Sequence, residues 1–122
     1  MYLNGCLGSI AVIDASIMDA SDPIESPLNN VQLLEEMCKD VIKESGLTIM
    51  NYQTHQFEPY GVTMLFLLAE SHLSIHTWPE NNCFSMDVHS CASDLDTNKI
   101  KIAINKALPI KRVHCQFIRR GI

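Results

Sequence analysis

The sequence predicts an α/β protein, specifically a two-layer sandwich in which a mainly antiparallel sheet carries two helices on one face. Two segments, within 29–46 and 94–109, repeat apolar residues at three- and four-residue spacing, as amphipathic helices do. The other apolar segments are short, and turn residues separate them, as expected for strands. The resulting order of strand, helix, several strands, helix and strand is typical of a two-layer sandwich. A chain of 122 residues predicts one domain, 1–122.

Composition and charge exclude several classes of function. With 47% hydrophobic and 19% charged residues, the chain is expected to fold as an ordinary soluble domain. The net charge of −5 and the lack of a long basic run predict no nucleic-acid partner. The longest apolar run, 62–69, is far too short to span a membrane, so no membrane partner is expected.

The cysteines are odd in number, scattered and without a C-x-x-C pair. This pattern argues against a disulfide framework or a zinc site, and with no signal peptide it predicts reduced thiols and a cytoplasmic location. Cys38 and Cys115 are interpreted as small buried hydrophobes, and Cys6 and Cys83 receive no role.

The first half of the chain predicts a strand, a loop and a helix. Residues 10–13 form a short apolar run suited to a buried strand that Asp14 closes, and 19–27 has the acids, prolines and serines of an exposed loop. Asn29 or Asn30 can cap the helix that follows, and Gly46 stands where a left-handed C-terminal cap is needed. The apolar stripe of this helix comprises Val31, Leu34, Met37, Cys38, Val41 and Ile42.

Three strands are predicted next. Residues 47–57 mix apolar and polar side chains as a strand does, and Pro59 and Gly61 make a turn. Residues 62–69 are apolar throughout, which predicts a central strand covered by helices on one face and by something else, such as a second subunit, on the other. Residues 70–80 are rich in β-branched and aromatic residues and read as the third strand.

The last third of the chain predicts a strand that forms a hairpin with segment 70–80, then a helix and a final strand. Asn81 and Asn82 make a turn, after which apolar and polar residues alternate through 84–89. Asp94 or Asp96 can cap the second helix, and Pro109 ends it. Its inner face would carry Ile100, Ala103, Ile104 and Ala107, and the closing strand alternates Val113, Cys115 and Phe117.

Segment 70–80, ESHLSIHTWPE, is the candidate functional site because it concentrates two acids, two histidines, two serines and the only tryptophan. In a strand, His72, Ser74 and His76 share one side. At about 3.3 Å per residue, the two histidine Cα atoms lie roughly 13 Å apart. One metal ion cannot hold both rings at that distance, so no metal site is predicted.

The Glu70-Ser71 peptide suggests its own chemistry. No G-x-S-x-G elbow is present, so a hydrolase nucleophile is not indicated. The Ser71 hydroxyl could instead attack the carbonyl carbon of Glu70 and convert the amide to an ester, since fixed proximity can supply an effective molarity on the order of 10⁵ M or more. Loss of the serine α-proton would then release the upstream chain, and hydrolysis of the dehydroalanine would leave a pyruvoyl group.

The block at 70–80, together with F-x-P-Y-G-V-T at 57–63 and Cys91 twenty residues after Ser71, closely resembles the short bacterial and archaeal S-adenosylmethionine decarboxylases. The likeness runs from about Asn30 to Arg119. It implies self-cleavage between Glu70 and Ser71, giving a beta chain of 1–70 and an alpha chain of 71–122. The implied activity is removal of the carboxylate of S-adenosylmethionine, which supplies aminopropyl groups for spermidine and other polyamines.

The resemblance also implies residue roles. Ser71 would become the pyruvoyl cofactor, which forms a Schiff base with the substrate amine. His76 would take the α-proton during processing, and Thr63 stands where the family usually has a serine that assists it. Cys91 would donate a proton after carbon dioxide leaves, which a thiol with an ordinary pKa of about 8.5 can do near pH 7.

By the same resemblance, Phe57 would stack on the adenine, Glu80 would bind the ribose hydroxyls and Trp78 would help to shape the pocket. Relatives of this length are homodimers of cleaved protomers whose active sites draw on both chains. His72 is left without a role, and His55, His89 and His114 are interpreted as structural or exposed. The basic pairs 111–112 and 119–120 are interpreted as a solvated edge.

Two alternatives stay open. The segment at 8–10, Gly-Ser-Ile, departs from the glycine, basic residue and histidine that many relatives have there, so a pyruvoyl-dependent arginine or ornithine decarboxylase on the same scaffold is possible. The other alternative is a processing-deficient paralogue that regulates a partner. Intact Ser71, His76 and Cys91 argue against it.

Overall fold

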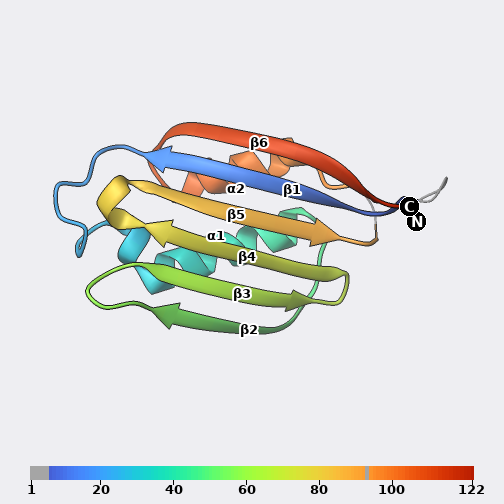
Figure 1. Ribbon diagram of the computed structural model, residues 1–122, viewed down its shortest axis with the longest axis horizontal. Coiled ribbons are helices and arrows are strands. Elements are labelled where there is room, and N and C mark those ends of the chain that lie inside the picture. Colours follow the sequence, from blue (N-terminus) through green and yellow to red (C-terminus); the bar gives the residue numbers. More distant parts are fainter. Residues whose placement is uncertain (1–5, 93) are drawn as a thin grey trace.

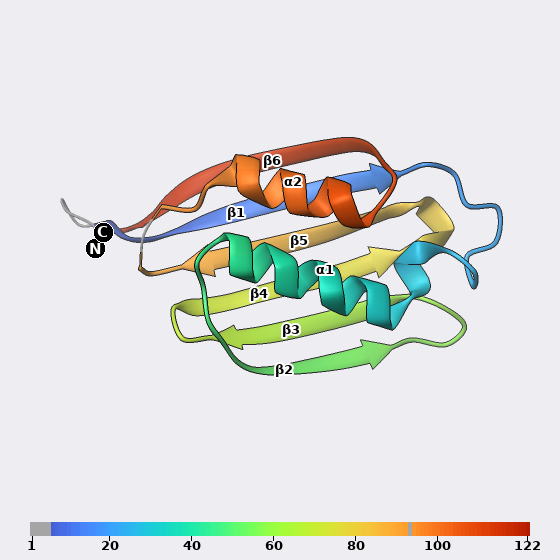
Figure 2. The same cartoon turned by 180° about the vertical axis from the view of Figure 1, so that it is seen from behind.

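A computed structural model describes residues 6–92 and 94–122, and it confirms the predicted sandwich. Six strands form one antiparallel sheet in the order β2-β3-β4-β5-β1-β6 (Figure 1). Two helices lie on one face of it (Figure 2). The strands are β1 (Cys6–Ile17), β2 (Ile49–Gln56), β3 (Val62–Leu68), β4 (Ser71–Trp78), β5 (Cys83–Ser90) and β6 (Ile110–Gly121). The helices are α1 (Val31–Glu44) and α2 (Thr97–Ala107), with 3-10 turns η1 (Pro27–Asn29) and η2 (Pro79–Asn81).

The ends of both helices follow their predicted caps. The Asn30 side chain accepts a hydrogen bond from the Leu33 N–H, and Gly46 after α1 has φ +72°, a left-handed conformation that glycine adopts without steric cost. Of the two acids predicted as caps for α2, Asp96 is the one that accepts from the first-turn N–H groups. No helix of the described residues is long and apolar enough to cross a membrane.

Strand β1 is longer than the predicted run of 10–13. It lies between β5 and β6, and its alternate residues Ala11, Ile13, Ala15 and Ile17 are all buried against the helices. Asp14 does not close the strand, because its side chain lies on the opposite face and accepts a 2.6 Å hydrogen bond from the Ser85 hydroxyl. Pairing on both sides therefore extends the strand through polar positions.

The face of the sheet opposite the helices, here called the open face, is not covered by any helix of the described chain (Figures 1 and 2). Strand β3 shows the consequence, since Met64 and Phe66 are buried while Leu65 and Leu67 are 54% and 55% exposed. The predicted cover on the second face of this strand is thus missing in a single chain.

Candidate active site

The β3–β4 turn places the Glu70-Ser71 peptide at one end of the sheet (Figure 1). Ser71 opens β4 with φ +150°, a region that residues other than glycine rarely occupy. Strict alternation would place its side chain with Leu73 on the helix-covered face. Instead, the Ser71 hydroxyl lies 2.9 Å from Nδ1 of His72 and 3.0 Å from Nδ1 of His89, which are on the open face. The unusual backbone conformation thus accompanies a hydroxyl held between two imidazoles.

Two hydrogen bonds hold Glu70, the residue before this hydroxyl, one at its main-chain carbonyl and one at its side chain. The Glu70 carbonyl oxygen accepts a 2.8 Å hydrogen bond from the Cys91 N–H, and the Glu70 side chain accepts one of 3.0 Å from the Thr48 N–H. Strand pairing brings these groups together, because Ser71 lies opposite Ser90 in the β4–β5 ladder. We call Glu70, Ser71, His72, His89 and Cys91 the Ser71 cluster.

A second group of predicted residues gathers near the other end of β4. Oγ1 of Thr63 and Nδ1 of His76 are hydrogen-bonded at 2.5 Å across the β3–β4 ladder. The rings of Phe57 and Trp78 pack edge-on against the His76 imidazole, with centroid separations of 5.8 and 4.4 Å. We call Phe57, Thr63, His76 and Trp78 the His76 cluster. Glu80 lies two residues beyond Trp78, exposed in η2.

Buried polar contacts fix the position of the His76 cluster. The buried hydroxyl of Thr77, next to His76, donates a 2.7 Å hydrogen bond to the Leu28 carbonyl and accepts one of 3.0 Å from the Val62 N–H. The Asn29 side chain accepts a 2.9 Å hydrogen bond from the Gly61 N–H, which steadies the turn after Phe57. The segment around η1 therefore anchors this end of β3 and β4.

Within one chain, the two clusters do not meet. Ser71 and His76 are five residues apart on the same strand, which corresponds to about 16 Å at roughly 3.3 Å per residue. A proton cannot pass directly between groups so far apart. The structure thus brings Cys91 to Ser71 and Thr63 to His76, and leaves the two pairs at opposite ends of β4.

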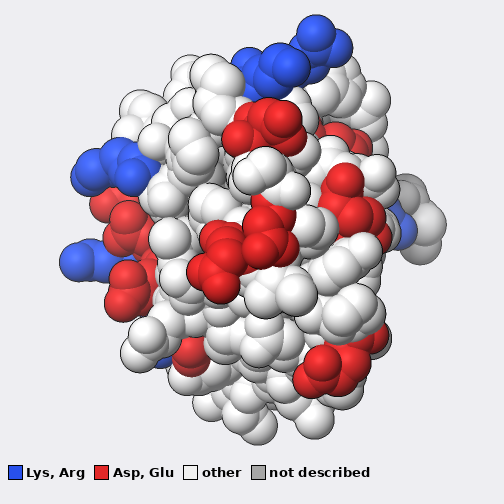
Figure 3. All heavy atoms as spheres, turned by 90° about the vertical axis from the view of Figure 1, so that its left-hand side faces the viewer, with Lys and Arg blue, Asp and Glu red and all other residues white. Residues whose placement is uncertain are grey.

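The charge of the molecule is uneven around these clusters. Figure 3 views the end that carries the 18–30 loop, the β2–β3 turn and η2, beside the His76 cluster, and acidic side chains occupy the middle of this surface. The exposed acids of these segments are Asp19, Asp22, Glu25, Glu58 and Glu80. This end is therefore suited to a cationic ligand.

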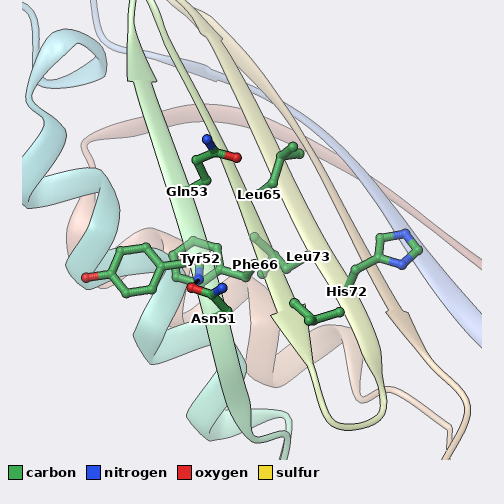
Figure 4. A pocket seen from close by; sticks show the side chains of 8 residues that line it. Asn51, Tyr52, Gln53, Leu65, Phe66, His72 and Leu73 are labelled. Carbon is green, nitrogen blue, oxygen red and sulfur yellow. Dashed lines mark hydrogen bonds between the residues drawn. The ribbon is translucent and has the colours of Figure 1, made fainter.

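A shallow depression of about 710 Å³ lies on the sheet near the Ser71 cluster. Leu65 and His72 project into it from neighbouring strands (Figure 4). Leu67 lines it as well, so two exposed apolar side chains of the open face adjoin the histidine that contacts Ser71.

His89 was interpreted as structural or exposed, and His72 was given no role, yet both contact the Ser71 hydroxyl. Partial burial, the nearby His72 and Arg120 lower the pKa of His89, in that order of importance. The sequence carries only part of the signal for this contact. A two-residue turn at 81–82 would pair residues whose numbers sum to 163, whereas the observed connection spans 79–82, so the numbers sum to 161 and His72 lies opposite His89.

Comparisons with known proteins identify relatives of this chain. The sequence profile of the family described as S-adenosylmethionine decarboxylase matches residues 14–121. The S-adenosylmethionine decarboxylase proenzyme of Thermotoga maritima is 45% identical over 94 residues, which cover 77% of this chain and 72% of that protein. A proenzyme of the same name from Prochlorococcus marinus is 48% identical over 75 residues, covering 62% of this chain and 60% of that one.

A comparison with solved structures also finds an adenosylmethionine decarboxylase. The crystal structure of the adenosylmethionine decarboxylase from Aquifex aeolicus superposes with a TM-score of 0.81 at 32% identity, covering 98% of this chain and 94% of that one. These relatives support decarboxylation of S-adenosylmethionine and give no support to the arginine, ornithine or regulatory alternatives. With a family profile that matches most of the sequence and a shared fold, this chain belongs to the S-adenosylmethionine decarboxylase family.

Proposed function

We propose that this chain is a proenzyme that cuts itself between Glu70 and Ser71 and then decarboxylates S-adenosylmethionine with the pyruvoyl group so formed. The observation that carries the proposal is the geometry of the Glu70 peptide. Its carbonyl accepts a hydrogen bond from the Cys91 N–H, and the adjacent Ser71 hydroxyl lies between two imidazole nitrogens. A polarised carbonyl beside a hydroxyl with available bases is what an acyl shift from nitrogen to oxygen requires.

The first stage of cleavage exchanges one bond for another. Oγ of Ser71 bonds to the carbonyl carbon of Glu70, the C–N bond between the two residues breaks, and the hydroxyl proton ends on the Ser71 nitrogen. Negative charge develops on the Glu70 oxygen during the shift, and the Cys91 N–H already points at that atom. The product is an ester with a free amine.

The second stage needs a base for the Ser71 α-proton. Its removal expels Glu70 as a carboxylate, and addition of water to the remaining dehydroalanine releases ammonia and leaves the pyruvoyl group. The role of base is proposed for His76, with Thr63 holding its Nδ1. Because His76 is about 16 Å from Ser71 on the same strand, the His76 that acts must belong to a second copy of the chain.

A homodimer formed through the open face would meet this requirement. In a two-fold pair, the Ser71 cluster of each copy can face the His76 cluster of the other, which makes two equivalent sites. Such a pair would also cover Leu65 and Leu67, which the helices leave exposed. Removal of these side chains from water favours association.

During turnover, the pyruvoyl carbonyl supplies an electron sink for the pair released with carbon dioxide. The Cys91 thiol is proposed as the acid that then protonates the substrate carbon. Phe57, Trp78 and Glu80 of the second copy are proposed to hold the adenosine, and the acidic end beside them favours a cationic sulfonium substrate. We place this activity in the cytoplasm, with no nucleic-acid or membrane partner.

Two measurements test the proposal. Denaturing mass spectrometry of the purified protein should show the fragments 1–70 and 71–122, the second beginning with a pyruvoyl group. An intact chain after prolonged incubation would contradict it. Release of labelled carbon dioxide should occur with S-adenosylmethionine, and equal release from arginine or ornithine would contradict the assignment of substrate.

A further inference from the structure

We propose that His89 is a catalytic residue of self-cleavage, whose Nδ1 accepts the proton of the Ser71 hydroxyl as Oγ attacks the Glu70 carbonyl. This inference rests on the self-cleavage proposed above and assigns the base of its first stage. The contact is direct, since Nδ1 of His89 lies 3.0 Å from Oγ of Ser71. It also lies within one chain, so this stage requires no residue of a second copy.

A hydroxyl has one proton, which decides the roles of its two neighbours. Oγ of Ser71 contacts Nδ1 of both His72 and His89, so it can donate to only one of them and must accept from the other. The rings of the two histidines meet edge to face with their centroids 5.2 Å apart. One imidazole therefore acts as the base, and the other orients the hydroxyl through its N–H.

The surroundings favour His89 as the base. His72 is exposed, whereas His89 is partly buried, and β1 passes so close that a Cβ atom on Gly8 would lie 3.3 Å from Nε2 of His89. Partial burial, and after it the charges of His72 on β4 and Arg120 on β6, lower the pKa of His89. On β1, its neighbours Gly8 and Ile10 do not titrate. His89 thus stays neutral, and able to accept a proton, at neutral pH.

The proton then has a defined route. Nδ1 of His89 takes it from Oγ as the new bond to the Glu70 carbon forms, while the Cys91 N–H stabilises the charge on the Glu70 oxygen. The protonated imidazole returns it to the Ser71 nitrogen when the C–N bond breaks. No other reactant is needed, and His89 is unchanged at the end.

The test compares the rate at which 1–70 and 71–122 appear in wild-type protein, His89→Phe, His72→Phe and the matched control His114→Phe. His114 is an exposed histidine on β6 and has no place in either cluster. Loss of a general base typically slows a reaction about 10²–10⁴-fold, and that is the slowing expected for His89→Phe. His72→Phe should be slowed less, and His114→Phe should match wild type.

Two further readouts separate chemistry from packing. The wild-type rate should rise with pH through an apparent pKa below the usual 6.5 of histidine, because protonation removes the acceptor, and His89→Phe should lose this step. Imidazole added to His89→Ala should restore cleavage in part. Circular dichroism checks the fold of each variant. If a variant at position 89 fails to fold, His89→Asn replaces it.

Cleavage of His89→Phe at the wild-type rate, or an unchanged pH profile, would overturn this inference. Greater slowing in His72→Phe than in His89→Phe would also overturn it, by assigning the base to His72. These results are distinct from a failure of the proposed function, in which the wild-type chain itself stays intact.

Discussion

The main-chain N–H of Cys91 donates a 2.8 Å hydrogen bond to the carbonyl oxygen of Glu70. The contact depends on the register of β4 and β5, which places Ser71 opposite Ser90 and so puts the next amide beside the turn. Cys91 is thus connected with Ser71 in two ways. Its amide faces the bond that is proposed to break, and its thiol is proposed to act later, in turnover.

Cys91→Ala separates these two roles. The variant keeps the N–H, so cleavage into 1–70 and 71–122 should proceed at close to the wild-type rate. Decarboxylation should fall by about 10²-fold or more, because the substrate carbon loses its acid. Mass spectrometry follows the first process and carbon dioxide release the second. Unchanged turnover would remove the thiol from the mechanism.

Cys91→Pro tests the amide itself. Position 91 lies just beyond β5, where proline is tolerated better than inside a strand. Loss of the N–H should slow cleavage about 10²–10³-fold, as expected when one donor to a developing oxyanion is removed. If this variant folds and is cut as fast as Cys91→Ala, the Glu70 carbonyl needs no activation from this amide.

Ser71→Ala should remain a single chain of 122 residues without decarboxylase activity, because the nucleophile and the source of the pyruvoyl group are both lost. Ser74→Ala is the matched control, since Ser74 is another partly buried serine of β4. It should be cut and active. A decarboxylating Ser71→Ala protein would contradict the pyruvoyl mechanism.

Gly8→Ala should slow cleavage although position 8 contributes no side chain to the reaction. A Cβ atom there would lie 2.7 Å from the Ser90 carbonyl oxygen, a distance that requires the backbone to move. Strand β5, which carries His89 and leads into Cys91, would shift away from Glu70. The rate of cleavage, compared with that of Ala11→Gly on the helix-facing side of β1, measures the effect. Equal rates for Gly8→Ala and wild type would show that this close packing is not needed.

Thr77→Val should destabilise the protein by about 1–3 kcal/mol, because it leaves the Leu28 carbonyl and the Val62 N–H buried without their partner. Urea unfolding measures the change in the free energy of unfolding, with the less buried Ser74→Ala as the control. Since Thr77 anchors the end of β4 that carries His76, the second stage of cleavage should slow as well. A loss of stability within experimental error would show that water replaces the lost hydrogen bonds.

Local patterns in the sequence predicted most of the elements. Asn30, Gly46 and Asp96 act as the expected caps, because each cap depends on a few neighbouring residues. The hairpin turn was expected at 81–82, but the connection begins two residues earlier, at Pro79, because η2 ends β4 at Trp78. The length of β1 was missed, since its pairing with β5 and β6 is nonlocal and carries the strand through Asp14. The prediction that helices cover only one face of 62–69 agrees with the burial of Met64 and Phe66 and the exposure of Leu65 and Leu67, although an apolar run alone does not show which face lacks a cover.

The candidate site depended only in part on local sequence. Segment 70–80 stands out by residue type, whereas Ser71, His76 and Cys91 were assigned by the resemblance to the family, and in the structure the Cys91 N–H contacts the Glu70 carbonyl next to Ser71. The contact of His89 with Ser71 could be predicted only from the β4–β5 register. The hydrogen bond from the Thr48 N–H to the Glu70 side chain could be predicted only from the position of Thr48 in the fold. Ser71 and His76 share a strand yet lie near its opposite ends, and the proposed second copy rests on this separation.

Mixing two inactive variants tests this central claim most directly. Ser71→Ala lacks the nucleophile, and His76→Ala lacks the proposed base, so neither alone should yield the pyruvoyl-bearing fragment 71–122. In a mixed dimer, one of the two sites combines the intact Ser71 of one copy with the intact His76 of the other. Co-expression should therefore produce pyruvoyl-bearing fragment from the His76→Ala chain. If co-expression produces heterodimers but none of that fragment, or if His76→Ala matures alone, the two clusters do not act across an interface.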